Sequence, residues 1–568
     1  MSTHRPYSPR SAVVDHTAAA AVSPSGTITN VRLLLIAFAF LALWFGVLDY
    51  RRLANPDEGR YAEIPREMVI TGDWITPRLN GIKYFEKPPL QYWITAAAYR
   101  AFGFSEWTTR LWPALAGMLG ILLTGWMAHR LYGRSAGWYA SLVLLSSFYY
   151  VAFSHIATLD MGLTLFLTAA LAAFVHAQQT AEHRRRRLSM LAAWAAMGFA
   201  VLSKGLIGIA LPALALIVYC LAQRDFTAIR RLSPVAGMLI LLTICAPWFI
   251  AVSLANPEFP YFFFVHEHFD RYTSNVHNRS GPLWYFLPIL VLAILPWLSI
   301  LTGAVRDCVR AQTSGGFNAA RFFLCWGGTV LVFFSLSGSK LPGYILPLMP
   351  AAALLIAERL NRLDRDAVLR HAGLLSLLLA TVLFIAAEIL ERTHFAKPFF
   401  PLYEGYGLWM EVASCVLFLG CGLVLWWRPA RTVAIMLFAS SGFAAGLITL
   451  TGFERLSPIY SGYQLAHAVG PFVNNETAVF SVGTYNQSLV PYLGRTVTLV
   501  AFQGEFAYGL RQEPQRHIPT LDEFEVVWRG SKNAIGIFEE NLLYELTKRK
   551  LPMHEITRNS REIVITKP

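Results

Sequence analysis

The 568-residue sequence is short of charge and has no cysteine in its long polar segments. Charged residues make up 15% of the chain, and hydrophobic residues make up 55%, whereas soluble domains average about 25% charged residues. This composition excludes intrinsic disorder and argues against an ordinary soluble enzyme. Because the six cysteines all lie in or beside apolar runs, we expect no disulfide framework in any exported part of the chain.

Apolar runs of nearly twenty residues recur along the chain, and this length crosses about 30 Å of hydrocarbon as a helix. The first run, residues 31–50, is too long for a signal-peptide core and lacks a clear cleavage site, so we expect a retained helix. Further spans are predicted at about residues 110–130, 135–153, 159–178, 188–203, 205–222, 234–254, 283–305, 321–338, 342–358, 372–390, 408–427 and 432–452. The sequence therefore predicts a polytopic α-helical membrane protein with about thirteen spans.

Short basic connections recur on one side of these spans, most densely at residues 184–187 and at Arg230 and Arg231. The positive-inside rule assigns that side to the cytoplasm. With an odd number of spans, the N-terminal tail of residues 1–30 is then cytoplasmic and the C-terminus lies outside. The long connections 51–109, 255–282 and 391–407 also fall on the outer face.

The composition becomes that of a soluble domain after the last span. Short apolar runs typical of strands occupy residues 477–482, 496–502, 534–538 and 562–566, and residues 540–548 have a helical pattern. We therefore expect a small outer α/β domain at residues 453–568, following a transmembrane domain at residues 31–452 that includes the large first loop.

The first outer loop holds the densest charge in the chain. Asp57 is its leading catalytic candidate. However, Asn55, Pro56 and Glu58 also fit an ordinary helix start, with Asn55 as the N-cap and Pro56 at the first helical position. Catalysis and helix capping therefore both stay open for Asp57.

Basic residues also occur at outer connections, where membrane orientation disfavours them. Each one alone could be a snorkelling side chain or a cap. Together, Lys87, Lys204, Arg271 and Lys340 break the positive-inside pattern, so we expect them to bind an anionic group at headgroup depth. Phosphate suits these side chains and a tyrosine hydroxyl such as that of Tyr344. The depth favours a lipid phosphate.

Four stretches together resemble the bacterial aminoarabinose transferases of lipid A, which are polyprenyl-phosphate-dependent glycosyltransferases of the C superfamily and relatives of the protein O-mannosyltransferases. The stretches are NPDEGRYAEIPREM at residues 55–68, the segment from GDW at 72–74 to FEKPPL at 85–90, SKG at 203–205 and KLPGYILP at 340–347. The resemblance covers essentially all the predicted spans. It implies a fold of this superfamily with an outer C-terminal domain.

The resemblance also implies the reaction. The donor would be undecaprenyl phosphate bearing 4-amino-4-deoxy-L-arabinose, and the acceptor would be a phosphate of lipid A. The enzyme would lie in the bacterial inner membrane with its active site facing the periplasm. No cofactor is required, because fixed cations can neutralise a monophosphate leaving group, and no nucleic-acid partner is expected.

Residue roles follow from matching the family's motifs. Lys87, Arg271 and Tyr344 would stabilise the departing lipid phosphate, with Lys204 and Lys340 as further candidates. Asp57 and Asp160 match the family's acidic positions. Asp57 would act as general base toward a hydroxyl acceptor, or would orient the acceptor or the donor amine if the acceptor is a phosphate. Asp160 would pair with a basic residue or contact the sugar, and the other predicted substrate contacts are Arg60, Tyr84 and Glu86.

The HEH triplet at residues 266–268 suggests a second hypothesis, a bound divalent cation such as zinc held by Glu86, His266 and His268. Residues two apart do not share a helix face, so both histidines could bind one ion only from an irregular backbone. The alternative is a pair of hydrogen-bonded histidines at headgroup level.

Two other functions stay open from the residues alone. A related enzyme could transfer another sugar or use a protein or glycan hydroxyl as acceptor. A lipid flippase or transporter is the non-enzymatic alternative, although the spans lack the charged residues at mid-membrane that mark most substrate pathways.

Overall fold

The computed structural model describes residue 35 and residues 38–270, 281–311, 316–394 and 399–568, without the side chains of residues 268–270. The chain forms two compact units, residues 1–46 and residues 47–568. In the first unit, residues 38–46 are helical, within the first predicted span.

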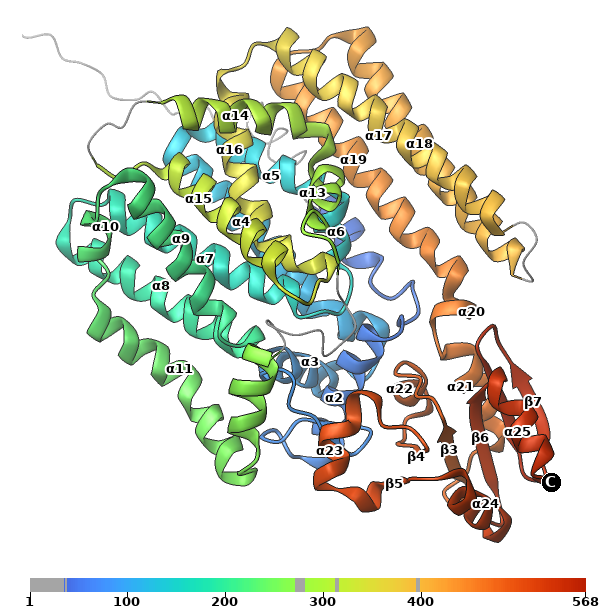
Figure 1. The fold of residues 1–568 in the computed structure, drawn as a ribbon. Coiled ribbons are helices and arrows are strands. Elements are labelled where there is room, and N and C mark those ends of the chain that lie inside the picture. The colour runs from blue at the N-terminus through green and yellow to red at the C-terminus, as the bar shows by residue number, and fades with distance from the viewer. Residues whose placement is uncertain (1–34, 36–37, 271–280, 312–315, 395–398) are drawn as a thin grey trace, which may run out of the picture. The chain divides into compact units, whose positions relative to one another are not determined.

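Helices, most of them apolar, make up most of the second unit (Figure 1). They are α4 (Glu106–Tyr132), α5 (Arg134–Leu145), α6 (Phe148–Ser154), α7 (Asp160–Gln179), α8 (His183–Lys204), α9 (Ile207–Gln223), α11 (Pro234–Ala255), α13 (Phe286–Ile294), α14 (Leu298–Arg310), α15 (Ala319–Leu336), α16 (Met349–Arg362), α17 (Arg365–His394), α18 (Phe400–Trp427) and α19 (Arg431–Gly452). Shorter pieces between them are α10 (Thr227–Arg230), the π-helix η1 (Tyr261–Asp270) and the 3₁₀ segments η2 (Leu295–Trp297) and η3 (Pro342–Leu348).

Every span predicted after the first coincides with one of these helices or with a consecutive pair. Within the described residues, nine helical segments are long and apolar enough to cross a membrane, or ten if the α5–α6 pair, bent by 73°, is one span. The polytopic fold is confirmed, but the count of thirteen is not. Two predicted spans fall short for physical reasons: α8 begins with a run of arginines, and α9 has only 17 residues.

The α7–α8 hairpin carries functional candidates at one end. Asp160 begins α7 and Lys204 ends α8, so both lie at the end opposite the loop that joins the helices. Gly205 follows with a φ of +86°, a conformation that glycine adopts without steric cost, and the chain then turns into α9.

The first loop folds into α2 (Asp57–Thr71), the short hairpin β1 (Arg78–Leu79) and β2 (Ile82–Lys83), and α3 (Leu90–Phe102). The expected N-cap role of Asn55 is wrong, because Pro56 occupies the cap position and makes no side-chain cap bond. Asn55 instead donates to Asn486 Oδ1 (2.9 Å) and accepts from the Ser488 backbone N–H (2.8 Å). Its side chain therefore joins the loop to the C-terminal segment.

The C-terminal segment contains a six-stranded mixed sheet in the order β5-β4-β3-β6-β8-β7. The strands are β3 (Ala478–Val482), β4 (Thr498–Val500), β5 (His517–Ile518), β6 (Ala534–Glu539), β7 (His554–Arg558) and β8 (Glu562–Thr566). The first four in sheet order are parallel, and β8 pairs antiparallel with β6 and β7. The predicted strands are thus confirmed, while the short β5 and the polar β7 were not predicted.

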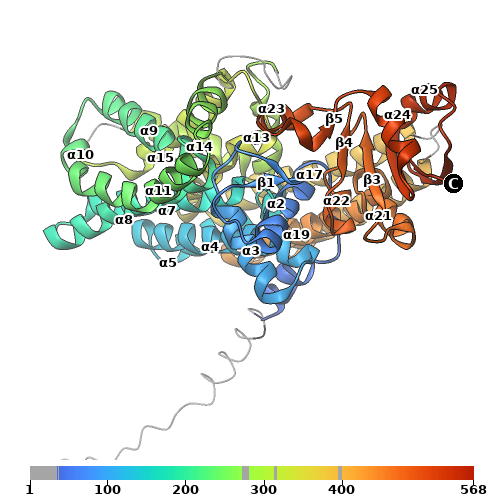
Figure 2. The same cartoon turned by 90° about the horizontal axis from the view of Figure 1, so that it is seen from below.

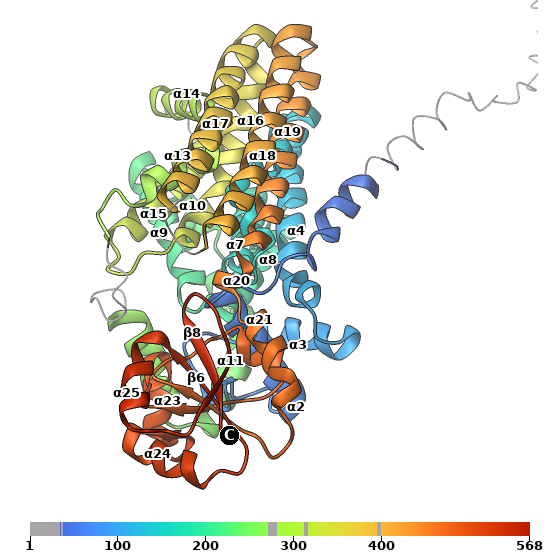
Figure 3. The same ribbon diagram turned by 90° about the vertical axis from the view of Figure 1, so that its right-hand side faces the viewer.

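Helices surround this sheet (Figures 2 and 3). They are α20 (Ser457–Tyr460), α21 (Tyr463–Val469), α22 (Leu489–Leu493), α23 (Ala507–Gln512), α24 (Leu521–Gly530) and α25 (Leu543–Lys548), with the 3₁₀ turns η4 (Phe453–Leu456), η5 (Gly470–Phe472), η6 (Gly504–Phe506), η7 (Pro514–Arg516) and η8 (Glu540–Leu542).

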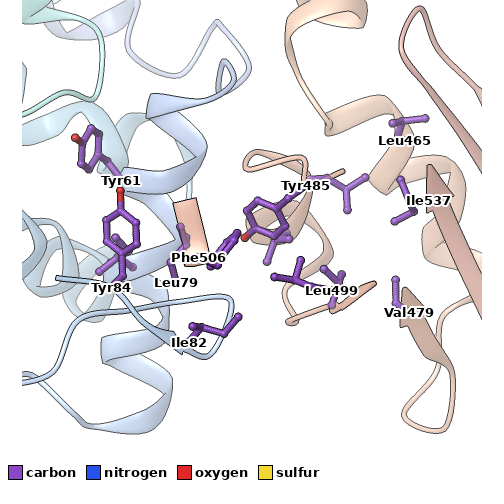
Figure 4. Packing of buried hydrophobic residues seen from close by; sticks show 14 of the residues in the cluster. Tyr61, Leu79, Ile82, Tyr84, Leu465, Val479, Tyr485, Leu499, Phe506 and Ile537 are labelled. Atoms are coloured by element: carbon purple, nitrogen blue, oxygen red, sulfur yellow. The ribbon is translucent and has the colours of Figure 1, made fainter. Parts of the chain in front are cut away.

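The two faces of the sheet are buried by different partners. On one face, Phe480 and Phe538 pack with Phe524 and Trp528 of α24. On the other face, alternate strand residues join a core cluster with the first loop, shown in Figure 4. Members of that cluster from the loop are Tyr61, Ile64, Met68, Leu79, Ile82 and Tyr84, and members from the sheet are Val479, Leu499, Ile535, Ile537 and Val564. The first loop and the C-terminal segment therefore share one hydrophobic core.

Candidate active site

A cavity of about 410 Å³ opens between the first loop and the ends of the membrane helices. Its walls come from α2, the segment before α3, α7, α8, α9, η1, α15 and η3. The lining residues are Asp57, Arg60, Tyr61, Glu86, Lys87, Thr158, Leu159, Asp160, Leu163, Lys204, Leu206, Ile207, Ala210, Glu267, Phe333, Phe334, Ser337, Ser339, Leu341 and Tyr344. One wall is rich in charged groups, and the α9 and α15 side is apolar.

Asp57 and Arg60 lie one helical turn apart on α2. Arg60 Nη1 is 3.1 Å from Asp57 Oδ1, and Arg60 Nη2 is 2.5 Å from Glu505 Oε2 of the C-terminal segment. Burial raises the pKa of the Glu505 carboxyl; the nearby Arg60 counteracts this shift, and Glu86 adds to it. The Asp57 side chain is 42% exposed, whereas that of Arg60 is 9% exposed. Arg60 is thus held in place, and the Asp57 carboxylate faces the cavity.

Tyr84 supports Arg60 from behind the cavity wall. Its ring centroid lies 5.9 Å from the Arg60 guanidinium carbon, within the range of a cation–π contact. The side chain is buried, and burial raises the pKa of its hydroxyl well above the ordinary value. Tyr84 therefore stays neutral and acts on the cavity through Arg60.

Lys87 and Glu267 form an ion pair in the cavity wall. Lys87 Nζ is 3.0 Å from Glu267 Oε2 and also donates to the Glu86 backbone carbonyl at 2.7 Å. Glu267 belongs to the HEH triplet, so its carboxylate faces a lysine of the first loop. This pair links η1 to the loop.

Asp160, Lys204 and Tyr344 form a third charged group. Lys204 donates to Asp160 Oδ1, and its Nζ lies 4.7 Å from the centroid of the Tyr344 ring. Gly343 makes this approach feasible, since a Cβ at that position would lie 2.8 Å from the Asp160 carboxyl. Glycine is therefore the residue that lets η3 approach the start of α7.

Seven of the predicted site residues line one cavity. They are Asp57, Arg60, Glu86, Lys87, Asp160, Lys204 and Tyr344. Lys340 is outside that lining; it is buried, and its Nζ donates to the Ser337 carbonyl at 2.6 Å. Arg271 falls outside the described residues, so its place at the phosphate stays a prediction.

The predicted metal site also stays a prediction. Across the described ranges, no three His, Cys, Asp or Glu side chains are grouped closely enough to hold an ion. His266 is half-buried against Phe262, with ring centroids 5.2 Å apart. The His268 side chain lies outside the described part, and the proposed ligand set is therefore untested.

Sequence reasoning missed several residues of this site. Glu505 belongs to no recognisable motif, and its partner Arg60 lies in a distant segment of the chain. Phe333 and Phe334 resemble any other residues of an apolar span, although they line the cavity. The pairing of Lys87 with Glu267 could have been inferred only from their opposite charges on two outer connections.

The chain is similar to known proteins over nearly its whole length. A protein of Proteus mirabilis (strain HI4320), named undecaprenyl phosphate-alpha-4-amino-4-deoxy-L-arabinose arabinosyl transferase 2, is 32% identical over 555 residues, which cover 95% of this chain and 98% of that one. The chain belongs to the aminoarabinose transferase family. A member from Pseudomonas aeruginosa (strain UCBPP-PA14) is 32% identical over 518 residues, covering 88% of this chain and 91% of the relative.

Family descriptions and solved structures extend this result. Residues 465–567 match the aminoarabinose transferase C-terminal domain, and residues 29–263 match the dolichyl-phosphate-mannose-protein mannosyltransferase family. The crystal structure of ArnT from Cupriavidus metallidurans bound to undecaprenyl phosphate is similar, with a TM-score of 0.87 and 36% sequence identity, covering 96% of this chain and 98% of that chain. The glycosyltransferase class and the membrane fold expected from the sequence are both confirmed.

Proposed function

We propose that this member of the family transfers 4-amino-4-deoxy-L-arabinose from undecaprenyl phosphate to phosphate groups of lipid A at the periplasmic face of the inner membrane. The observation that carries the proposal is the cavity, in which charged side chains of α2, α7 and α8 face apolar side chains of α9 and α15. A phosphate attached to a polyprenyl chain needs both surfaces. The relatives' names and the undecaprenyl phosphate bound to ArnT support the choice of donor.

In the reaction, an oxygen of the lipid A phosphate bonds to the anomeric carbon, the bond between that carbon and the donor phosphate oxygen breaks, and the electrons of the broken bond stay on the departing phosphate. Lys87 and Lys204 supply fixed positive charge for that phosphate, and Tyr344 supplies a neutral donor. Arg271 is assigned to the same phosphate from its motif. Glu267 and Asp160 hold these two lysines at the cavity through ion pairs.

Asp57 acts on the sugar or acceptor side of the cavity. A lipid A phosphate is already anionic and needs no general base, so the carboxylate orients the acceptor or the cationic donor amine instead. Arg60 fixes Asp57 from one side through the 3.1 Å contact. Asp160, held by Lys204, contacts the sugar, and Arg60 and Glu86 complete the polar wall.

The proposed topology has a cytoplasmic tail at residues 1–30, a transmembrane domain at residues 31–452 and a periplasmic domain at residues 453–568. The basic residues support it, because residues 184–187 lie in the first turns of α8, at the end opposite Asp160 and Lys204. Reporter fusions after Arg187 and after Glu476 should report opposite compartments. The same compartment for both fusions would overturn this topology.

Reconstitution with defined substrates tests the function. Purified protein in vesicles, given the aminoarabinose-bearing carrier and lipid A, should produce lipid A heavier by one pentosamine in mass spectra. Omitting either the protein or the donor should abolish the increment. An increment of a different sugar, or transfer to a hydroxyl in place of a phosphate, would support the related-enzyme alternative, and carrier movement without transfer would support a flippase.

A further inference from the structure

A second charged cavity lies at the other end of the α7–α8 hairpin. It has a volume of about 380 Å³ and is formed by the starts of α8 and α11 and by the turn around α10. These three helices lie at the left of Figure 1. Its basic residues are His183, Arg186, Arg187, Arg230 and Arg231. Because α8 has 22 residues, the two ends of the helix are about 33 Å apart, roughly one hydrocarbon thickness. This basic pocket is therefore separate from the candidate active site.

Most arginines of the pocket have no acidic partner in contact among the described residues. Across the described ranges, Arg186, Arg187 and Arg230 make no ion pair. The nearby Glu182 pairs with Arg185 at 2.7 Å, and Asp225 accepts hydrogen bonds from Thr227. Four arginines thus line one space, and Asp225, whose pKa is lowered by its hydrogen bonds from Thr227 and in part by Arg230, is the acid nearest to them that the described residues show.

Two helix N-termini add to this field. His183 begins α8, and Pro234, Val235 and Ala236 begin α11 at the pocket wall. Ser233, the N-cap residue of α11, makes no side-chain cap bond. Cations at a helix N-terminus are unfavourable, and the first backbone N–H groups of a helix lack internal partners. A bound anion would resolve both features.

The turn that carries Arg230 and Arg231 is held in place. Trp194 Nε1 donates to the Leu232 carbonyl (2.8 Å), Gln178 Nε2 donates to the Ala228 carbonyl (3.2 Å) and Arg231 Nη1 donates to the Gln178 carbonyl (2.7 Å). Because these bonds attach the turn to α7 and α8, the pocket is preformed.

An apolar cavity of about 240 Å³ adjoins the same turn. Ile229 and Leu232 line it, whereas Arg230 and Arg231, which lie between them in sequence, line the basic pocket. Met190 and Trp194 of α8 and Ala213 of α9 continue the apolar wall. A basic pocket next to an apolar cavity at the membrane boundary has the two surfaces of a phospholipid site.

We propose that this end of the hairpin binds an anionic phospholipid, with its phosphate headgroup among Arg186, Arg187, Arg230 and Arg231 and an acyl chain in the adjoining cavity. The ligand is a membrane lipid of net negative charge. A zwitterionic phospholipid is disfavoured because its ammonium group would enter the same positive field.

Native mass spectrometry of the detergent-purified protein tests the proposal, with phosphatidylglycerol, phosphatidylethanolamine and glycerol 3-phosphate as probes. Phosphatidylglycerol should bind at least about tenfold more tightly than the other two. Equal binding of phosphatidylethanolamine would overturn the charge assignment. Equal binding of glycerol 3-phosphate would show a free-phosphate site and overturn the lipid assignment.

Variants locate the site. Arg186→Glu with Arg230→Glu should weaken phosphatidylglycerol binding at least about tenfold. The matched control is Arg184→Glu, in the same arginine run but outside the pocket lining, which should change binding less than about twofold. Equal losses from the control and the double variant would overturn the site.

Two further variants control for misfolding of the double reversal and test the acyl-chain cavity. If the double reversal lowers the unfolding temperature without lipid, Arg186→Gln with Arg230→Gln replaces it, and an unchanged affinity in that variant would also overturn the site. Ala213→Leu should reduce phosphatidylglycerol binding severalfold and leave glycerol 3-phosphate binding unchanged. Unchanged lipid binding in Ala213→Leu would contradict the acyl-chain cavity.

Discussion

Asp57 and Glu58 are consecutive acidic residues at the start of α2, but they lie in different surroundings. The Asp57 side chain is 42% exposed and faces the cavity, whereas the Glu58 side chain is 1% exposed. Arg110 Nε donates to Glu58 Oε1 at 2.7 Å, and Arg110 Nη2 donates to Oε2 at 2.9 Å. Of these two neighbouring carboxylates, Asp57 therefore lines the cavity of the candidate active site, and Glu58 lies in the protein interior.

In the buried Glu58–Arg110 pair, all five N–H donors of Arg110 have acceptors within the protein. Arg110 also donates to the backbone carbonyls of Leu48, Arg51 and Arg52, and Glu58 accepts from the N–H groups of Ala54 and Ala157. No donor of Arg110 is left for a ligand. The charged pairs of the candidate active site, by contrast, line a cavity that a substrate can enter without breaking the fold. A charged residue is therefore a catalytic candidate when it lines such a cavity, and charge by itself is not sufficient.

The largest expected effect on transfer is that of replacing Asp57, the carboxylate that lines the cavity. Asp57→Asn should abolish transfer, because the amide cannot attract the donor amine or hold the acceptor as the carboxylate does. Binding of undecaprenyl phosphate should stay nearly unchanged, since Asp57 is not assigned to the phosphate. Transfer assays and carrier-lipid affinity, measured on the same preparation, check both statements. Loss of carrier binding in this variant would move Asp57 to the phosphate side.

Glu58→Gln tests whether the buried ion pair between Glu58 and Arg110 stabilises the fold. Removing one partner of a buried ion pair leaves Arg110 uncompensated and should lower the free energy of unfolding by about 3–5 kcal/mol. Denaturant unfolding in detergent measures the loss. A variant that unfolds at the same denaturant concentration as the parent would show that Glu58 is not a structural charge.

The pH dependence of unfolding sharpens the same test. Burial alone would raise the pKa of the Glu58 carboxyl, but Arg110 and Arg51 outweigh it, and the pKa falls to about 2 from about 4.5. A lowered pKa stabilises the fold above pH 4.5, and this contribution disappears as the pH falls toward 2. The parent should therefore lose more stability than Glu58→Gln across that window, and parallel curves would contradict the pairing.

Lys87→Ala should slow transfer about a hundredfold, or about 3 kcal/mol, because one fixed charge at the leaving phosphate is lost. Carrier affinity should fall as well. Lys83→Ala is the matched control, since Lys83 in the same loop pairs with Glu258 at 2.7 Å and does not line the cavity. Equal rates for the two variants would remove Lys87 from the phosphate site.

The smallest effect is expected where the first loop meets the C-terminal sheet. Asn80 Nδ2 donates to the Val497 carbonyl, and Asn80 Oδ1 accepts from the Val497 N–H, both at 2.8 Å. Asn80→Ala leaves these buried groups without partners and should cost about 1–3 kcal/mol of stability. The transfer rate per folded molecule should not change. A slower rate at full folding would show that this interface also shapes the cavity.

The sequence predicted the parts of the molecule that local pattern controls. Apolar length located the helices, and motif residues such as Asp57 and Lys204 fall in one cavity. The bend between α5 and α6 was missed, because hydropathy continues through it. The local signal was Ser147, whose hydroxyl caps α6 by accepting from the Tyr150 N–H at 3.2 Å.

Contacts between distant segments could not be predicted. Glu58 and Arg110 are 52 residues apart, and both read as ordinary charges near a helix start. Glu505 meets Arg60 only after the sheet has packed on the first loop. Pairing across such separations depends on tertiary packing, which leaves no periodic trace in one sequence.

The shared core of the first loop and the C-terminal sheet also sets the order in which the enzyme can be assembled. Asn80 meets Val497 across 417 residues, so at roughly 5–20 residues per second the ribosome needs about 20–80 seconds to supply the loop's partner. During that interval every membrane helix can be inserted while α2 still lacks its packing surface. A chain cut short before β3 would therefore be fully inserted and yet inactive, because Glu505, which holds Arg60, is synthesised only after the last membrane helix.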